Sequence, residues 1–481
     1  MALHFERMRL WTGHTQLDVF LKIDKESRHL IMKTKLLSLS CLLVSLAANL
    51  FAAEDSASSE SYLKQFEPKP APQAQGLVLE KGDRLAICGD SITEQKMYSR
   101  IMETYLTVCV PDLNVSVRQY GWGGETASGF LARMTNDCLR FKPTIATTCY
   151  GMNDHRYGRY TEAIGKLYRD KQTAIVESFK NHGARVVLGS PGCVSHKDLP
   201  LNQNLCTLRN IDIEIAEGEK VGFADVFWPM LTAEVKAHEI YATNYWIAGG
   251  DGVHPGWAGH LVMAYAFLKG FGLDGNLGNV TVDLDSGKAT AQGGHEVVSS
   301  KPGEIEIKSS RYPFCATGDM NLKSQNSVLS GMSLVPFNKD LNRFMLVASA
   351  GKAARYKVTW GTQSKSYSAA ELQSGVNLAN DFAINPFVDA FKKVDAAVGS
   401  KQNYETKQIK QIFHDLISGK NKSADDVKDA EMKKLFSYRS EDGKWDRDGL
   451  AAATEETRAP LVQKIKDAFV PVTHTIRIEA E

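Results

Sequence analysis

Between residues 77 and 272, short apolar runs of β-type residues alternate with longer segments of helical periodicity. The β-type runs include RLAIC, NVSVRQYG, TIATTCYG, RVVLGSP and VGFADVF. Such alternation predicts a parallel sheet covered by helices on both faces, because consecutive parallel strands need a crossover connection. We therefore expect a doubly wound α/β domain over residues 77–275, whose ligands bind at the carboxyl ends of its strands.

Two of the strand-end segments carry residues suited to nucleophilic catalysis. Ser91 ends the GDS sequence directly after the first predicted strand, and DGVHP places Asp251 and His254 three residues apart on one loop. A serine hydroxyl becomes a nucleophile when an imidazole takes its proton and a carboxylate orients that imidazole. A simpler interpretation stays open, since Asp and Ser are common helix N-caps and His254 can stack on Trp257.

Two further loops follow the next two strands, GWGGET at residues 121–126 and GMND at residues 151–154. Glycine lets the backbone approach a ligand and point an N–H group at it. The Asn153 side chain can donate a hydrogen bond to an oxyanion, and Asp154 can hold its loop by accepting backbone N–H bonds. Both loops are also ordinary turn sequences, and Thr126 can cap a helix. Neither has the spacing of a dinucleotide or phosphate loop.

Taken in order, GDSITE, GGET, GMND and DGVHP resemble the four sequence blocks of the SGNH or GDSL-type hydrolases. The resemblance covers about residues 77–272. It implies a flavodoxin-like sheet and ester hydrolysis through an acyl-enzyme intermediate. The residue roles that it implies are a triad of Ser91, His254 and Asp251, an oxyanion hole from Ser91 N–H, Gly124 N–H and the Asn153 side chain, and support from Asp90 and Asp154. Ile92 departs from the GDSL label, a variation that the family tolerates.

No metal ion or cofactor is predicted. Neither His238-Glu239 nor His295-Glu296 is extended to an H-E-x-x-H pair. His260 should lie within a helix, so it ranks below His254 as the catalytic base. The absence of G-x-S-x-G argues against the nucleophile elbow of α/β-hydrolases. With 57 Lys plus Arg against 56 Asp plus Glu, the chain lacks the charge of a nucleic-acid binder, and no protein partner is inferred.

An apolar segment at residues 36–51 follows two lysines and leads into two alanines, the pattern of a secretory signal. It is shorter than the roughly 20 apolar residues of a membrane span. We assign residues 32–53 to a cleaved signal peptide, residues 1–31 to an extension from a misassigned start codon, and residues 54–76 to a linker. The mature protein is then periplasmic or secreted, without a stable membrane span. Its best disulfide candidate is Cys193 with Cys206.

Aromatic residues near the four blocks bear on the substrate. Export, the GDSITE sequence and the residues Trp122, Tyr150, Tyr157 and Trp246 make the chain similar to exported esterases that remove acetyl groups from carbohydrates. We expect Trp122, Tyr150 and Trp246 to contact a small-molecule or polysaccharide ester, although such rings can equally pack loops. A lipid esterase, lysophospholipase or thioesterase of the same superfamily is the alternative. A non-catalytic carbohydrate-binding or scaffold protein is a second one.

The remaining residues differ in pattern. Segments in 276–380 alternate polar and apolar residues with Gly, Ser and Asn between them, which predicts an antiparallel β unit. Residues 381–470 have helical spacing and mixed charge, and we expect their charged faces to be solvated. Residues 471–481 read as a strand that returns to the β unit. The helical region would then be an insertion within that unit.

Overall fold

A computed structural model describes residues 60–241, 244–418 and 423–481. The predicted extension and signal peptide, with residues 54–59 of the linker, lie outside the described residues. The chain divides into two compact units, Met1–Gln65 and Phe66–Glu481. In the first, residues 60–63 are helical and Lys64 pairs with Glu60. All elements below belong to the second unit.

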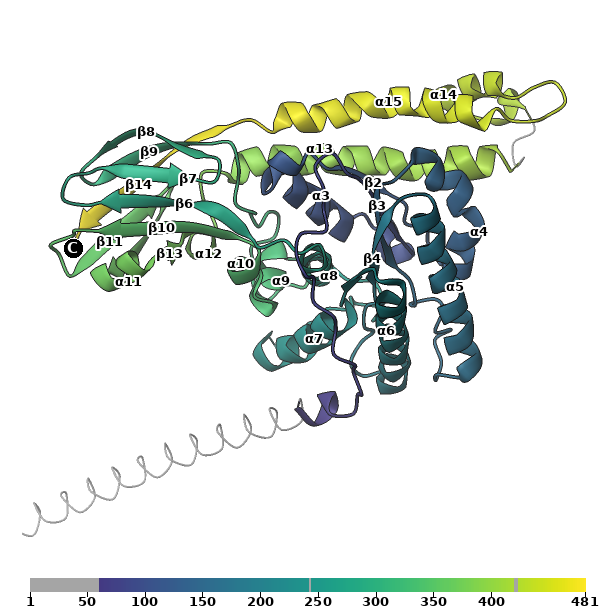
Figure 1. Cartoon of the computed structure of the whole chain (residues 1–481), viewed down its shortest axis with the longest axis horizontal. Coiled ribbons are helices and arrows are strands. Elements are labelled where there is room, and N and C mark those ends of the chain that lie inside the picture. Colours follow the sequence, from purple (N-terminus) through teal and green to yellow (C-terminus); the bar gives the residue numbers. More distant parts are fainter. Residues whose placement is uncertain (1–59, 242–243, 419–422) are drawn as a thin grey trace, which may run out of the picture. The chain divides into compact units, whose positions relative to one another are not determined.

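A five-stranded sheet with the order β2-β1-β3-β4-β5 is the centre of the α/β domain. Figure 1 shows its strands β2, β3 and β4 among the surrounding helices. All strand pairs of the sheet are parallel. This is the flavodoxin-like order, which confirms the predicted fold class. Strand β3 is buried along its whole length, as expected for a strand covered on both faces. The strands are β1 (Arg84–Gly89), β2 (Ser116–Gln119), β3 (Ile145–Cys149), β4 (Arg185–Gly189) and β5 (Gly222–Ala224).

Helices cover both faces of this sheet. On one face α3 packs against α8, with the rings of Tyr98 and Phe267 stacked at 5.5 Å. On the other face α4, α5 and α6 bury the apolar residues of β1, β3 and β4. The Thr126 side chain caps α4 by accepting the N–H of Gly129. The domain's helices are α2 (Ser91–Glu94), α3 (Tyr98–Val108), α4 (Ala127–Asp137), α5 (Glu162–Asn181), α6 (Leu199–Glu219), α7 (Phe227–Tyr241) and α8 (Trp257–Gly270), with 3₁₀ turns η1 (Pro111–Leu113) and η2 (Leu139–Phe141).

The C-terminal β unit contains two sheets, of orders β13-β10-β6-β7 and β12-β11-β14-β9-β8. The second is antiparallel throughout. In the first, β6 and β10 are parallel, so the prediction of a purely antiparallel unit is wrong for this pair. Three strands and two short helices separate β6 from β10, enough chain for the crossover that a parallel pair needs.

The elements of the β unit are β6 (Asn276–Asp283), β7 (Ala289–Gln292), β8 (His295–Lys301), β9 (Glu304–Ser309), α9 (Val328–Leu334), α10 (Phe337–Asp340), β10 (Arg343–Ser349), β11 (Arg355–Trp360), β12 (Gln363–Ser368), α11 (Ala369–Ser374), β13 (Val376–Asn377), α12 (Leu378–Asp381) and β14 (Val472–Ala480). Strand β14 lies between β9 and β11 and is antiparallel to both. The chain therefore returns to the β unit after an inserted helical region, as predicted.

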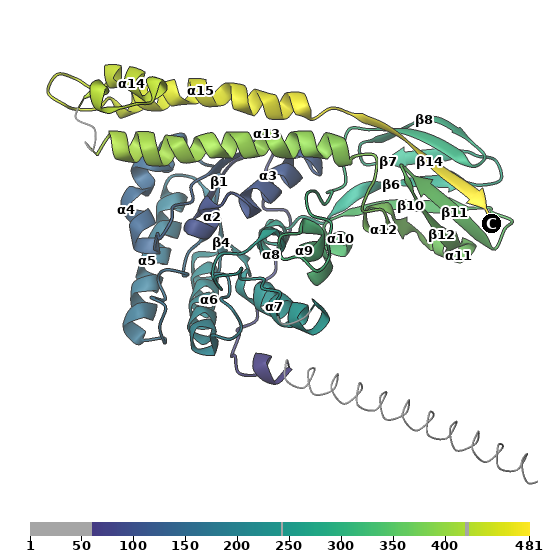
Figure 2. The same cartoon turned by 180° about the vertical axis from the view of Figure 1, so that it is seen from behind.

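The helical insertion lies along the α/β domain, with α13 and α15 side by side (Figures 1 and 2). It consists of α13 (Val388–Thr406), the π-helical η3 (Lys407–Leu416), η4 (Ala424–Asp426), α14 (Ala430–Lys434), η5 (Leu435–Tyr438) and α15 (Arg447–Ala468). Its charged residues cover the edge strand β2. Lys401 and Arg458 donate to the Val117 carbonyl, and Glu405 accepts the N–H of Gln119.

Lys401 and Glu405 are 1% and 0% exposed, so the expectation that charged faces of the insertion are solvated is wrong for these residues. The physical reason is that an edge strand presents unpaired N–H and C=O groups, which charged side chains can satisfy.

The seven cysteines in the described part of the chain are all buried free thiols, so the predicted Cys193–Cys206 disulfide is wrong. Burial raises the pKa of both thiols, to about 11 for Cys206. Their charged neighbours differ, since Glu234 lies near Cys193 whereas Arg209 and Asp225 lie near Cys206. Among the described residues, no helix is long and apolar enough to cross a membrane.

Candidate active site

Ser91, His254 and Asp251 form a continuous chain of hydrogen bonds. Ser91 begins α2 just after β1, and the other two lie on the loop before α8. Ser91 Oγ lies 2.8 Å from His254 Nε2, and His254 Nδ1 lies 2.7 Å from Asp251 Oδ2. When Nδ1 donates its proton to the carboxylate, Nε2 is left as an acceptor for the serine proton. The arrangement can therefore generate a serine nucleophile.

The loop geometry keeps Asp251 in place. Its Oδ1 accepts the backbone N–H groups of Val253 at 3.0 Å and His254 at 2.8 Å. Burial acts to raise the pKa of Asp251, but these hydrogen bonds and the imidazole together hold it below its ordinary value. Gly249 has a φ of +87°, and a Cβ there would lie 1.7 Å from the His254 carbonyl oxygen. The loop therefore requires glycine at this position.

Gly124 and Asn153 lie on the two neighbouring loops. Gly124 is exposed with a φ of +74°, so its backbone is open to a ligand. Asn153 Nδ2 donates to the Glu125 carbonyl at 3.0 Å, and Asn153 Oδ1 accepts the Tyr157 hydroxyl at 3.3 Å. An amide nitrogen carries two N–H groups, so Asn153 can bind Glu125 and still donate to an oxyanion.

Two aspartates support the loops of the site, Asp154 by linking two of them and Asp90 by capping α2. Asp154 accepts the N–H of Gly151 at 3.0 Å and that of Ala127 at 3.1 Å, which links the Asn153 loop to the start of α4. Asp90 is 2% exposed and caps α2 by accepting the N–H of Ile92 at 3.0 Å. Burial raises the pKa of Asp90 to about 7 and that of Asp154 to about 6, against the opposing effect of the backbone donors.

Tyr150 is fully buried, so the prediction that it contacts substrate is wrong. Its hydroxyl donates to Glu125 at 3.0 Å, and its ring stacks on Phe130 at 5.4 Å. Arg133 forms two further hydrogen bonds to the same carboxylate, at 2.6 and 2.7 Å. Tyr150 thus belongs to a buried network that supports the glycine loop from within.

The other aromatic residues are more accessible. Tyr157 is 50% exposed beside Asn153. Trp122 is half-buried, with Arg133 and Lys410 within 5.0 Å of its ring centre and His414 at 4.8 Å. Trp246 is also half-buried, and its ring packs on His196 and His238.

His260 lies inside α8, as expected, and its side chain is fully buried. Its Nδ1 accepts the Tyr98 N–H at 3.2 Å, and its Nε2 lies 3.0 Å from Gln95 Oε1. Burial lowers the pKa of His260 to about 3. It is therefore a neutral structural imidazole.

A comparison with known families decides what kind of domain carries these residues. Residues 87–262 match the GDSL-like Lipase/Acylhydrolase family. The match runs from β1 into α8 and spans Ser91, Asp251 and His254. The α/β domain of this chain belongs to the GDSL-like lipase/acylhydrolase family. The protein is accordingly a hydrolase of ester bonds.

Related proteins extend the comparison beyond this GDSL-like domain. An acetylxylan esterase from Geobacillus stearothermophilus is 24% identical over 216 residues, which make up 40% of this chain and 95% of that protein. A solved gut microbial diltiazem-metabolizing enzyme is 21% identical and superposes with a TM-score of 0.64, covering 84% of this chain and 98% of its own. A crystal structure of an acetylxylan esterase from Geobacillus stearothermophilus, 22% identical, covers 41% of this chain and 97% of its own with a TM-score of 0.36. The second similarity shows a shared fold that reaches beyond the GDSL-like domain.

Glu94 is a residue of the GDSL-like site that the sequence analysis did not single out. Its Oε2 accepts the N–H of Gly123, next to Gly124, and its Oε1 accepts Lys410 Nζ at 2.7 Å. Glu94 ends the GDSITE block one helical turn after Ser91, and this spacing was the available signal. The sequence offers no signal for Lys410, because this residue lies 316 residues away from Glu94.

Proposed function

We propose that this chain is an exported serine esterase that removes acetyl groups from carbohydrates. The hydrogen-bonded series Asp251–His254–Ser91 carries the catalytic part of the proposal. The identity of 24% to an acetylxylan esterase supports an acetylated carbohydrate as substrate. The predicted signal peptide at residues 32–53 supports export.

In the first half-reaction, Ser91 Oγ attacks the carbonyl carbon of the ester while its proton moves to His254 Nε2. Asp251 holds the imidazole and stabilises its protonated form. The carbonyl oxygen becomes an oxyanion, which accepts hydrogen bonds from Ser91 N–H, Gly124 N–H and Asn153 Nδ2. Collapse of this intermediate breaks the bond to the alcohol oxygen, which leaves with the proton from His254.

In the second half-reaction, a water molecule gives a proton to His254 and attacks the acyl group on Ser91. The same donors stabilise the second oxyanion. When the bond to Ser91 breaks, its Oγ recovers the proton from His254, and the acid is released. No redox or metal chemistry enters either step. The proton of Ser91 leaves with the alcohol, and a proton of the attacking water replaces it.

Aromatic residues beside this site suit a carbohydrate. Tyr157 is half-exposed next to Asn153, and Trp122 is half-buried next to the exposed Gly123 and Gly124. Aromatic rings offer flat apolar surfaces with a polar edge, which match the faces of sugar rings. We assign the sugar contact to Tyr157 and Trp122, and Trp246 to a packing role.

The test compares hydrolysis of acetylated xylan, p-nitrophenyl acetate and a long-chain p-nitrophenyl ester by the wild type and by Ser91→Ala. We expect release of acetate from the first two by the wild type alone. Preference for the long-chain ester would favour the lipid esterase alternative. A fluorophosphonate probe should label the wild type and not Ser91→Ala. If the wild type shows neither labelling nor hydrolysis, the result would support the non-catalytic alternative.

Export is tested separately by expressing the full chain in a Gram-negative bacterium and sequencing the N-terminus of the periplasmic fraction. The proposal predicts a mature chain that begins near residue 54. An uncleaved chain in the cytoplasm would contradict export without affecting the esterase assignment.

A further inference from the structure

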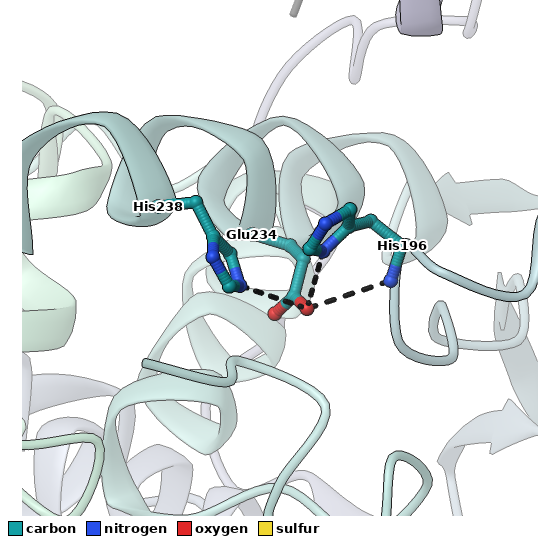
Figure 3. A group of neighbouring side chains, drawn as sticks. All are labelled: His196, Glu234 and His238. Atoms are coloured by element: carbon teal, nitrogen blue, oxygen red, sulfur yellow. Dashed lines mark hydrogen bonds and ion pairs between the residues drawn. The ribbon is translucent and has the colours of Figure 1, made fainter. Parts of the chain in front are cut away.

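His196, Glu234 and His238 form a second group of neighbouring side chains (Figure 3). His196 comes from the loop between β4 and α6, and the other two lie one turn apart on α7. Each of the three residues offers one ligand atom, an imidazole nitrogen or a carboxylate oxygen, and these three atoms lie within 4.8 Å of one another. His196 Nδ1 is 3.3 Å and His238 Nε2 is 3.7 Å from the same Glu234 oxygen, Oε1.

Glu234 is fully buried, whereas His238 and His196 are 12% and 27% exposed. A buried carboxylate is costly unless a cation or several donors compensate it. In the described part of the chain, its ion-pair partners are these two imidazoles. The His196 backbone N–H also donates to Oε1 at 3.5 Å, and the Ile247 N–H donates to Oε2. A cation held against this buried carboxylate would lower the cost of its burial.

His238 Nε2 is a buried atom without a hydrogen-bond partner among the described residues. If Nε2 carries a proton, 3.7 Å is too long for a hydrogen bond to Glu234. If it does not, its lone pair faces a carboxylate oxygen and is repelled by it. With Nε2 unprotonated and Nδ1 carrying the ring proton, a cation held between Nε2 and Glu234 removes the repulsion, because a metal ion accepts electron pairs from nitrogen and oxygen alike.

We propose that His196, Glu234 and His238 bind a divalent transition-metal ion, for which Zn²⁺ is the best match. Two imidazole nitrogens and one carboxylate oxygen are donors that suit Zn²⁺, whereas Ca²⁺ and Mg²⁺ prefer oxygen ligands alone. Ligands about 2.0–2.2 Å from a tetrahedral ion lie roughly 3.3–3.6 Å apart. The separations of 3.3 and 3.7 Å agree with this spacing. Water would complete the coordination on the side of the partly exposed His196.

The bound ion would stabilise the catalytic loop rather than touch substrate. Ser195, next to His196, donates its N–H to the Gly252 carbonyl at 2.9 Å. Ile247, whose N–H binds Glu234, precedes the same loop. The ion would thus join α7 to both segments that hold the loop of Asp251 and His254. Trp246 covers the two imidazoles, and Lys197 Nζ lies 4.6 Å from the centre of its ring.

No metal is predicted from the sequence because it contains no H-E-x-x-H pair. The Glu234-x-x-x-His238 spacing on α7 was a signal, since residues four apart share one helix face. His196 could not be added to it, because only the fold brings that loop to α7.

The test measures metal directly and does not depend on esterase activity. The full chain is treated with a chelator, dialysed and titrated with Zn²⁺, and bound zinc is counted by mass spectrometry. We compare the wild type with His196→Ala, His238→Ala and the control His182→Ala, which removes an exposed histidine at the end of α5. We expect one Zn²⁺ per chain in the wild type and control, and at least about tenfold weaker binding in the other two.

Two further measurements accompany the titration. Zn²⁺ should raise the Tm of the wild type and of His182→Ala. It should leave the Tm of His196→Ala and of His238→Ala unchanged. Co²⁺ should give the wild type a visible absorption band that both ligand variants lack. If His238→Ala fails to fold, His238→Phe fills the space of the ring without supplying a ligand. No stoichiometric Zn²⁺ in the wild type, or equal binding by the ligand variants, would overturn the proposal and leave a hydrogen-bonded cluster.

Discussion

Lys410 donates a hydrogen bond of 2.7 Å to Glu94, although 316 residues separate them in the sequence. Glu94 also accepts the N–H of Gly123, which precedes the proposed oxyanion donor Gly124. Lys410 belongs to η3 of the helical insertion, so the insertion reaches the glycine loop of the α/β domain. The C-terminal region therefore supports the site as well as lying beside it.

Lys410→Met should lower kcat for p-nitrophenyl acetate and leave KM nearly unchanged, because it frees Glu94 from its partner and loosens the glycine loop. Lys410 is about one-third exposed, so we expect the activation free energy to rise by about 1 kcal/mol, which lowers kcat about fivefold. Lys393→Met, an exposed lysine on α13, is the matched control. Equal kcat values for the two variants would disprove this role of Lys410.

Asn153→Ala should reduce kcat by about 10² to 10³, the usual effect of removing one oxyanion donor, without changing Tm by more than a few degrees. Tyr157→Phe is the comparison, because it removes only the hydroxyl that Asn153 Oδ1 accepts. We expect Tyr157→Phe to reduce kcat by less than about tenfold. A large loss of kcat with Tyr157→Phe and a small one with Asn153→Ala would contradict the assignment of Asn153 as an oxyanion donor.

Glu405→Gln should destabilise the fold by about 3 kcal/mol, because breaking a buried charge network leaves its partners uncompensated. Glu405 is fully buried with Lys401 and Arg458, and it also binds the Gln119 N–H of edge strand β2. Urea denaturation measures the loss. The control is Lys444→Ala, whose side chain is 85% exposed and which should change stability by less than about 1 kcal/mol. An equal effect of both variants would mean that the network contributes nothing.

Asp90→Asn should make the free energy of unfolding less dependent on pH. Burial raises the pKa of Asp90 from 3.8 to about 7, so the folded state keeps a proton that the unfolded chain has already lost. The stability that this proton contributes is fully present below pH 3.8 and disappears as the pH rises through about 7. At about 1.4 kcal/mol per pKa unit, the change is on the order of 4 kcal/mol.

Asparagine stays neutral and can still accept the Ile92 N–H. The free energy of unfolding of Asp90→Asn should therefore equal that of the wild type at acidic pH and exceed it above pH 7. Denaturant unfolding at a series of pH values measures this. Parallel curves for the two proteins would contradict a protonated Asp90.

Local sequence patterns predicted much of the site, because its residues follow strand ends. Ser91 and Asn153 come just after β1 and β3, and parallel strands bring their carboxyl ends to one edge. Asp251 and His254 bind each other within one loop. The prediction failed at Tyr150, because the residue after a strand can point into the core as well as towards the site, and only packing decides between them.

The amino-acid sequence by itself determined the doubly wound α/β domain, the GDSL-like blocks and the helical insertion in a β unit. Each depends on residues that lie close together in the chain, where periodicity and turn chemistry act. Only the tertiary structure decided that β6 and β10 are parallel, that Lys401 and Glu405 cover β2, and that Lys410 reaches Glu94. These contacts join distant segments, and whether a charged side chain is solvated or buried depends on what the folded chain places against it.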